Sequence, residues 1–251
     1  MSKLNTVELF GINVHNFNMQ QTVMFIDDAI RCKKQVVHNC LNANKVVLIQ
    51  KDEMLMQSLV EADIISADGQ AVVWASRLFG KPLQERVPGI DLMNEIIKHA
   101  AVEGYKAFFF GAKEEIVLEV TKLYIKNYGK EIIGGYRNGY YSEEEEIAIA
   151  KKINESGSSI LFVAIPSPQK EIFIKKHKSL MPNVSLMMGV GGSFDVVAGL
   201  VRRAPRWMQN NGLEWLFRLI QEPHKMWRRY LIGNFKYLLL TWRAYRNSAP
   251  R

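Results

Sequence analysis

Residues 158–181 read SSILFVAIPSPQKEIFIKKHKSLM, and this stretch decides the fold. Its first eight residues form a nearly continuous apolar run, which is typical of a strand covered on both faces. The remainder has the composition of a helix at the surface of a domain. A strand followed at once by a helix is the repeating unit of an α/β fold with a parallel sheet.

The same alternation recurs along most of the chain. The expected strands lie at residues 7–14, 35–40, 62–67, 105–112, 131–136, 158–165 and 183–191. The expected helices lie at residues 18–34, 42–62, 70–80, 113–129, 142–157, 166–181 and 192–201. In the acidic run SEEEE, Ser142 and Glu145 have the spacing of a capping box, which indicates a helix start. We therefore predict a Rossmann-like α/β fold, with a largely parallel sheet and helices on both faces.

The pattern changes after residue 201. Residues 202–251 contain four of the five tryptophans, and eleven Lys or Arg stand there against Glu214 and Glu222. We predict an α/β catalytic domain over residues 1–201 and a helical, basic appendage over residues 202–251, with helix breaks near Asn210–Gly212, Pro223 and Gly233. This charge points to an anionic partner: a membrane surface, a nucleic acid or a phosphate-bearing substrate.

Composition narrows the class of protein. Cys32 and Cys40 are too few for a disulfide framework and fit a reducing compartment. The first residues lack the apolar core of a signal peptide, and the longest charge-free run, residues 179–194, is broken by Pro, Asn, Ser and Gly. We expect a protein of the cytoplasmic side without a transmembrane segment.

Polar side chains and glycines follow the predicted strands where each strand ends. In an open parallel sheet, such residues meet at one mouth, where ligands bind. The set comprises Cys40, Asn42, Asp68, Gly111, the segment Pro166–Glu171 with Lys170 and Glu171, and the glycines Gly189, Gly191 and Gly192. Asp68 precedes the predicted helix 70–80, so it is interpreted either as the cap of that helix or as a working carboxylate.

The common nucleotide-binding motifs are absent from the sequence. In GVGGSFD, residues 189–195, Phe194 stands where a dinucleotide site has its third glycine, and neither a P-loop nor a D-x-D pair occurs. The five histidines are scattered without metal-ligand spacing. The sequence predicts no metal and no cofactor. Phosphate contacts would rest on Arg86, in a Pro-flanked loop, on Lys170, near a helix start, and on backbone N–H groups.

Five segments together resemble the WecG/TagA/CpsF family of glycosyltransferases: residues 68–92, 135–145, 167–171, 189–207 and 212–230. The most distinctive feature is R-A-P-x-W followed by G-L-E-W. The resemblance implies a bacterial transferase that moves a sugar, N-acetylmannosamine or a related hexose or uronic acid, from a UDP-sugar. The implied acceptor is a sugar on a polyprenyl diphosphate, such as undecaprenyl-diphosphate N-acetylglucosamine, in cell-surface polysaccharide biosynthesis. The chemistry implied is inverting and metal-independent.

The resemblance also implies roles for single residues. Asp68 matches the family's proposed base, and Asn42 and Arg86 match an asparagine and an arginine of its motifs. The appendage is expected to complete the active site and to lie on the anionic inner face of the cell membrane. The arginines expected nearest the lipid diphosphate are Arg202, Arg203 and Arg206. Two departures from the family pattern, Cys40 for Thr and Lys170 for Gln, leave the donor sugar open.

Two other classes compete with this interpretation. A nucleic-acid-binding module could use the basic, aromatic-rich appendage, although that segment lacks a recognised docking motif. An NAD-linked enzyme is disfavoured by Phe194. The sequence therefore favours a UDP-sugar-dependent glycosyltransferase with no nucleic-acid partner. It leaves open the acceptor sugar, the linkage, the pathway and the oligomeric state, a homo-oligomer included.

Overall fold

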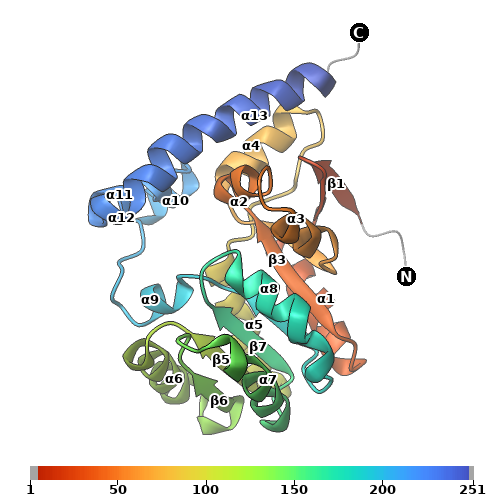
Figure 1. The fold of residues 1–251 in the computed structure, drawn as a ribbon, viewed down its shortest axis with the longest axis vertical. Coiled ribbons are helices and arrows are strands. Elements are labelled where there is room, and N and C mark those ends of the chain that lie inside the picture. Colours follow the sequence, from red (N-terminus) through yellow and green to blue (C-terminus); the bar gives the residue numbers. More distant parts are fainter. Residues whose placement is uncertain (1–4, 249–251) are drawn as a thin grey trace.

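The computed structural model describes residues 5–248 and contains a central six-stranded sheet (Figure 1). The strand order is β4-β3-β8-β7-β5-β6, and every neighbouring pair is parallel. The strands are β3 (Val36–Leu41), β4 (Ile64–Ala67), β5 (Ala107–Gly111), β6 (Ile133–Arg137), β7 (Ile160–Ala164) and β8 (Leu186–Gly189). The predicted α/β fold is confirmed.

Helices cover both faces of this sheet because its central strands are apolar on both sides. Phe109 and Phe162 pack in one core, whereas Phe108 and Leu161, their neighbours along the strands, pack in another. The first core is covered by α1 (Met19–Arg31), α5 (Gly89–Glu103) and α6 (Glu114–Tyr128), and the second by α7 (Glu146–Glu155) and α8 (Gln169–His177). The capping box of Ser142 and Glu145 is present at the start of the α7 region.

The N-terminal part departs from the predicted pattern in two places. The single strand predicted at residues 7–14 is a hairpin of β1 (Thr6–Leu9) and β2 (Ile12–His15), because Phe10 and Gly11 turn the chain with φ of 55° and 79°. The single helix predicted at residues 42–62 is split into α2 (Ala43–Leu48) and α3 (Glu53–Val60). Asp52 starts the second helix, since its carboxylate accepts a hydrogen bond from the Leu55 N–H.

Helix α5 was absent from the predicted pattern, although it decides the geometry of the site. It follows α4 (Gln70–Leu78) and a loop that contains Arg86. Its buried residues Leu92, Met93, Ile96, Ile97 and Ala100 recur at helical spacing, and Pro88 stands at its N-cap. Two prolines before this helix, Pro82 and Pro88, are typical of a loop and therefore did not favour a helix in this region.

The described part of the C-terminal segment, residues 202–248, contains helices joined by short turns and no strand. After the short α9 (Ser193–Val197) come α10 (Arg206–Asn210), α11 (Glu214–Gln221), α12 (Pro223–Trp227), the π-helical turn η4 (Arg228–Ile232) and α13 (Gly233–Ser248). The break predicted at Gly233 is wrong, because Gly233 adopts helical angles, φ −65° and ψ −47°, and η4 runs directly into α13. A glycine without a neighbouring proline weakens a helix but does not interrupt its hydrogen bonds.

Helix α13 lies across α2 and α4 on the body of the protein (Figure 1). Tyr237 is buried in the same core as Phe10, and its hydroxyl donates a hydrogen bond of 2.9 Å to the Ala71 carbonyl oxygen. The C-terminal segment thus passes over the carboxyl ends of β3 and β4, where the predicted site lies.

Candidate active site

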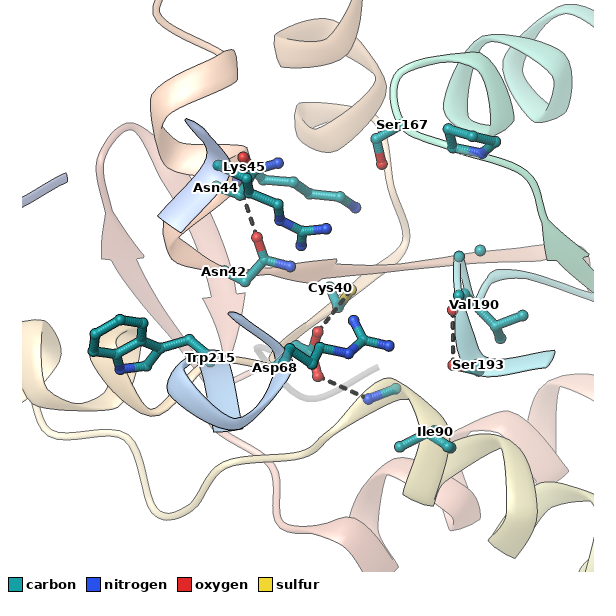
Figure 2. Close-up of a pocket in the computed structure, with 18 of the residues that line it drawn as sticks. Cys40, Asn42, Asn44, Lys45, Asp68, Ile90, Ser167, Val190, Ser193 and Trp215 are labelled. Atoms are coloured by element: carbon teal, nitrogen blue, oxygen red, sulfur yellow. Dashed lines mark hydrogen bonds between the residues drawn. The ribbon is translucent and has the colours of Figure 1, made fainter. Parts of the chain in front are cut away.

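Asp68 lies immediately after β4, at the floor of a large cavity (Figure 2). Its Oδ1 accepts a hydrogen bond of 3.0 Å from the backbone N–H of Gly89, and the Cys40 thiol donates to Oδ2 over 3.8 Å. The expected cap of helix α4 is not formed by this side chain, since Gly69 is the N-cap. Asp68 instead caps the first turn of α5, whose early N–H groups have no partner within the helix.

Cys40 and Asn42 flank Asp68 from the end of β3, as the sequence predicted. Burial raises the pKa of the Cys40 thiol to about 11, so the thiol stays protonated and acts as a donor toward Asp68. Asn42 caps α2, because its Oδ1 accepts a hydrogen bond of 3.1 Å from the Lys45 N–H. This bond occupies the amide oxygen and leaves the amide N–H groups for a ligand.

A buried cluster of two lysines and one glutamate lies beside these residues. Lys45, Lys170 and Glu171 are 3%, 5% and 2% exposed. Glu171 Oε1 pairs with Lys45 Nζ at 2.9 Å and with Lys170 Nζ at 3.1 Å. Ser167 donates to the same carboxylate and accepts from the Lys170 ammonium. Two ammonium groups thus share one carboxylate, which leaves a net charge of about +1 at the wall of the cavity.

The ionisation of this cluster follows from burial and from the close charges. Burial lowers the pKa of Lys170, and repulsion from Lys45 lowers it further. Burial alone would raise the pKa of Glu171, yet the two lysines lower it overall. Glu171 therefore stays a carboxylate that holds both ammonium groups. The sequence did not indicate that Lys45 belongs to the site, because it stands among apolar residues in a predicted helix, where a lysine is ordinarily at the surface.

Packing against Lys170 explains why a glycine stands at position 189, which the sequence did not reveal. A Cβ at this position would lie 2.8 Å from Lys170 Cε and 2.9 Å from Cδ. The glycine therefore makes room for the lysine side chain along the end of β8. Gly191 and Gly192 line the cavity, and a Cβ on Gly192 would lie 3.6 Å from Arg218 Nη2.

Arg86 reaches the cavity from the loop before α5, where it meets the C-terminal segment. Its Nη1 lies 2.5 Å from Oε2 of Glu214, the first residue of α11. Arg203 forms a bidentate pair with Asp91 in the first turn of α5, and its Nε is 3.8 Å from Glu214 Oε1. No local sequence pattern marks Asp91 or Glu214, because only docking of the segment brings them to the two arginines.

Arg202 and Arg206, the other two predicted arginines, contribute less to the cavity. Arg202 is exposed at the rim of the cavity, and its backbone exchanges hydrogen bonds with the Gln221 side chain. Arg206 starts α10, is exposed, and lies outside the cavity lining. Arg86, Lys170 and Arg203 line the same cavity as Asp68 and are less exposed than Arg202 and Arg206.

The cavity itself has a volume of about 1910 Å³ and is lined by residues of both the body and the C-terminal segment. Its polar part is lined by Asp68 together with Cys40, Asn42, Lys45, Arg86, Lys170, Arg203 and Glu214. Its apolar part lies between α4 and the C-terminal helices, and the residues that line it include Trp74, Leu78, Trp215, Tyr230 and Leu238. Trp215 is on the opposite side of Asp68 from Val190 (Figure 2).

Two further features concern metals and membranes. Within residues 5–248, no group of three or more His, Cys, Asp or Glu side chains is placed to hold a metal ion. In the same part of the chain, every helix is too short or too polar to cross a bilayer.

Comparisons with known proteins agree with the geometry. A sequence model described as "Glycosyl transferase WecG/TagA/CpsF family" matches residues 7–251. A curated protein of Bacillus spizizenii, N-acetylglucosaminyldiphosphoundecaprenol N-acetyl-beta-D-mannosaminyltransferase, is 39% identical over 173 residues. The matched part covers 69% of this chain and 66% of the relative, slightly less than two thirds of its length. Both matches are to glycosyltransferases, rather than to the nucleic-acid-binding or NAD-linked proteins weighed above.

Proposed function

Because this chain belongs to the WecG/TagA/CpsF family of glycosyltransferases, we propose that it transfers N-acetylmannosamine from a UDP-sugar. The proposed acceptor is N-acetylglucosamine on undecaprenyl diphosphate. The printed activity of the Bacillus relative supports both the transferred sugar and the acceptor. UDP as the carrier comes from the family resemblance in the sequence.

The arrangement of Asp68 is the observation that carries this proposal. A carboxylate at the floor of a cavity, with both oxygens held by the Gly89 N–H and the Cys40 thiol, has a fixed orientation. Each oxygen keeps a second lone pair for an acceptor hydroxyl. In the proposed step Asp68 takes the proton of that hydroxyl, the new bond forms at the anomeric carbon, and the bond to UDP breaks on the opposite face. The anomeric configuration is inverted.

The departing diphosphate needs positive charge, and the chain supplies it around Asp68. Lys45 and Lys170 share a single carboxylate, so their cluster keeps a net positive charge in a buried place, where charges are poorly screened. Arg86 adds a planar guanidinium suited to phosphate oxygens. We propose that these groups, with the Gly191–Gly192 turn, take the part that a metal ion plays in other transferases.

The size and the lining of the cavity support two substrates at once. A volume of about 1910 Å³ is well above the ~300–1000 Å³ usual for one small ligand. The polar floor suits a nucleotide sugar. The apolar part near Trp74 and Leu238 suits the first units of a polyprenyl chain.

We also propose that residues 202–251 form an appendage that attaches the protein to the inner face of the cell membrane. Tyr237 and Thr241 of α13 face the body, whereas Phe235, Leu238 and Trp242 are 63%, 64% and 54% exposed. The basic residues Lys236, Arg243 and Arg246 are exposed on the same helix. A helix with exposed apolar and cationic side chains binds anionic interfaces.

One experiment tests the proposed reaction. The purified protein is incubated with UDP-N-acetylmannosamine, UDP-N-acetylmannosaminuronic acid, UDP-N-acetylglucosamine and UDP-glucose, each with a short-chain polyprenyl-diphosphate N-acetylglucosamine. Mass spectrometry of the lipid product reports transfer. The proposal expects the strongest transfer from UDP-N-acetylmannosamine, with and without EDTA. Absence of any lipid-linked disaccharide would contradict it.

A further inference from the structure

Glu214, in the C-terminal segment, pairs with an arginine of the body. It lies 128 positions after Arg86 in the sequence, and the Arg86 Nη1 to Glu214 Oε2 distance is 2.5 Å. The two side chains are only 13% and 31% exposed, so the pair lies at the inner edge of the cavity. Among residues 5–248, Glu214 is the one side chain that accepts a hydrogen bond from Arg86.

Arg86 has donors to spare in this arrangement. A guanidinium carries five N–H groups in a planar fork, and the pair with Glu214 uses Nη1 alone. The remaining N–H groups, on Nε and Nη2, can meet an anion while the ion pair persists. Arg86 lines the cavity, as does Glu214, so these donors are within the space that a ligand would enter.

Arg203 uses more of its N–H groups in ion pairing than Arg86 does. Both of its terminal nitrogens bind the Asp91 carboxylate, and its buried Nε has no hydrogen-bond partner among the described residues. Asp91 raises the pKa of Arg203, with burial opposing that effect. This pair ties the segment before α10 to the first turn of α5. It anchors the C-terminal segment to the body.

The four side chains together carry no net charge, since two arginines face two carboxylates. Attraction of a diphosphate by Arg86 therefore depends on where its N–H groups point rather than on excess charge. A free arginine side chain loses rotamer entropy when it is fixed. An ion pair that fixes it before the ligand arrives removes that cost from binding.

We infer that Glu214 is a positioning residue, which holds the Arg86 guanidinium so that its free N–H groups meet the diphosphate of the substrate. The identity of the ligand as a diphosphate rests on the proposed function. The body thus supplies the arginine, and the C-terminal segment supplies the carboxylate that orients it.

A double-mutant cycle tests this inference. Binding of inorganic pyrophosphate to the full-length chain is measured by titration calorimetry for the wild type, Glu214→Ala, Arg86→Ala and the double variant. We expect Glu214→Ala to weaken binding about tenfold and Arg86→Ala to weaken it further. The double variant should bind like Arg86→Ala alone, because Glu214 acts only through Arg86.

The matched control is Tyr237→Phe, which removes another tie of the segment to the body, the hydrogen bond to the Ala71 carbonyl oxygen, and leaves the Arg86–Glu214 pair intact. Its effect should add to that of Arg86→Ala. If Glu214→Ala costs as much in the Arg86→Ala background as in the wild type, Glu214 merely anchors the segment and the inference is wrong. Tighter binding by Glu214→Ala would also overturn it, since Glu214 would then compete with the ligand.

A second variant and the choice of pyrophosphate as the ligand keep the test decisive. Glu214→Gln preserves the shape of the side chain and is compared in the same cycle if the alanine variant does not fold, as judged by circular dichroism. Pyrophosphate binding needs no sugar transfer, so a wild-type protein that binds pyrophosphate without transferase activity overturns the proposed function alone. A wild type that does not bind pyrophosphate overturns the inference.

Discussion

The backbone N–H of Gly89 donates a hydrogen bond of 3.0 Å to Asp68 Oδ1, although the two residues lie 21 positions apart. The bond joins the end of strand β4 to the start of helix α5. It satisfies an N–H that has no partner within the helix, and it fixes the carboxylate that we propose as the base. The same carboxylate is therefore structural and placed for chemistry.

Replacement of Asp68 by Asn separates these two roles. The Asn oxygen can still accept the Gly89 hydrogen bond, so the melting temperature should change little, whereas a general base is lost. We expect the transfer rate to fall roughly 10²–10⁴-fold. The matched control is Asp63→Asn, at the other end of β4, where the carboxylate accepts a hydrogen bond from the Val37 N–H. A wild-type rate for the Asp68 variant would remove the base assignment.

Replacement of Gly189 by Ala should displace Lys170. The new Cβ would lie 2.8 Å from Lys170 Cε, so the ammonium must leave its place beside Glu171. We expect a higher KM for the donor sugar nucleotide and a loss of stability of about 1–3 kcal/mol. Initial rates and urea unfolding measure the two effects.

The control for this variant is Gly233→Ala. Gly233 is helical, and nothing lies within 4 Å of its added Cβ. This substitution should leave the kinetics unchanged and keep or slightly raise stability. Equal behaviour of the two alanine variants would show that Gly189 does not support Lys170.

Stability should fall in acid partly because of His38. Burial, with nearby Lys45 and His15, lowers the pKa of this histidine to about 3, and its Nε2 lies 3.0 Å from the Ser66 hydroxyl oxygen. The folded state holds it neutral, so its contribution is complete above the unfolded pKa of about 6.5 and is lost as the pH falls toward 3. The slope from this one proton approaches about 1.4 kcal/mol per pH unit.

Urea unfolding between pH 7.5 and 4 measures that slope. His38→Gln, which can keep a hydrogen bond to Ser66, should unfold with a flatter dependence on pH over this range. His224→Gln, at an exposed position, is the control and should retain the wild-type slope. An unchanged slope in the His38 variant would show that other groups govern acid stability.

If the exposed face of α13 binds the membrane, acidic substitutions on that face should reduce binding to anionic vesicles. Phe235→Glu with Trp242→Glu places two negative charges on exposed positions of that helix outside the cavity lining, where burial in an anionic interface would become unfavourable. Sedimentation with phosphatidylglycerol vesicles should fall several-fold relative to the wild type. Val102→Glu is the control, because Val102 is 79% exposed on α5, away from α13. Equal sedimentation of the wild type and the double variant would refute the proposal.

Much of the fold could be predicted because its signals are local. The continuous apolar runs 105–112 and 158–165 gave two central strands, and the capping-box spacing of Ser142 and Glu145 gave a helix start. Parallel pairing then brings the carboxyl ends of β3, β4, β7 and β8 to one edge. Cys40, Asn42, Asp68 and Lys170 line one cavity there, as their places after the strands predicted.

Other features were missed because competing local signals stood beside them. The prolines around Arg86 indicated a loop and obscured the helical spacing of α5, which begins one residue after Pro88. Gly233 indicated a break, although its backbone continues the helix. Lys45 resembled a surface residue of an ordinary helix, yet it is buried against Glu171.

The sequence by itself determined the α/β alternation, the residues at the strand ends and the charge of the C-terminal segment, since each depends on neighbours within a few positions. Only the tertiary structure decided that Asp68 is held by α5, that Glu171 is shared by two lysines, and that Glu214 faces Arg86. Such contacts join residues up to 128 positions apart. They exist only after the sheet has formed and the C-terminal helices have docked over it, and no local periodicity records that docking.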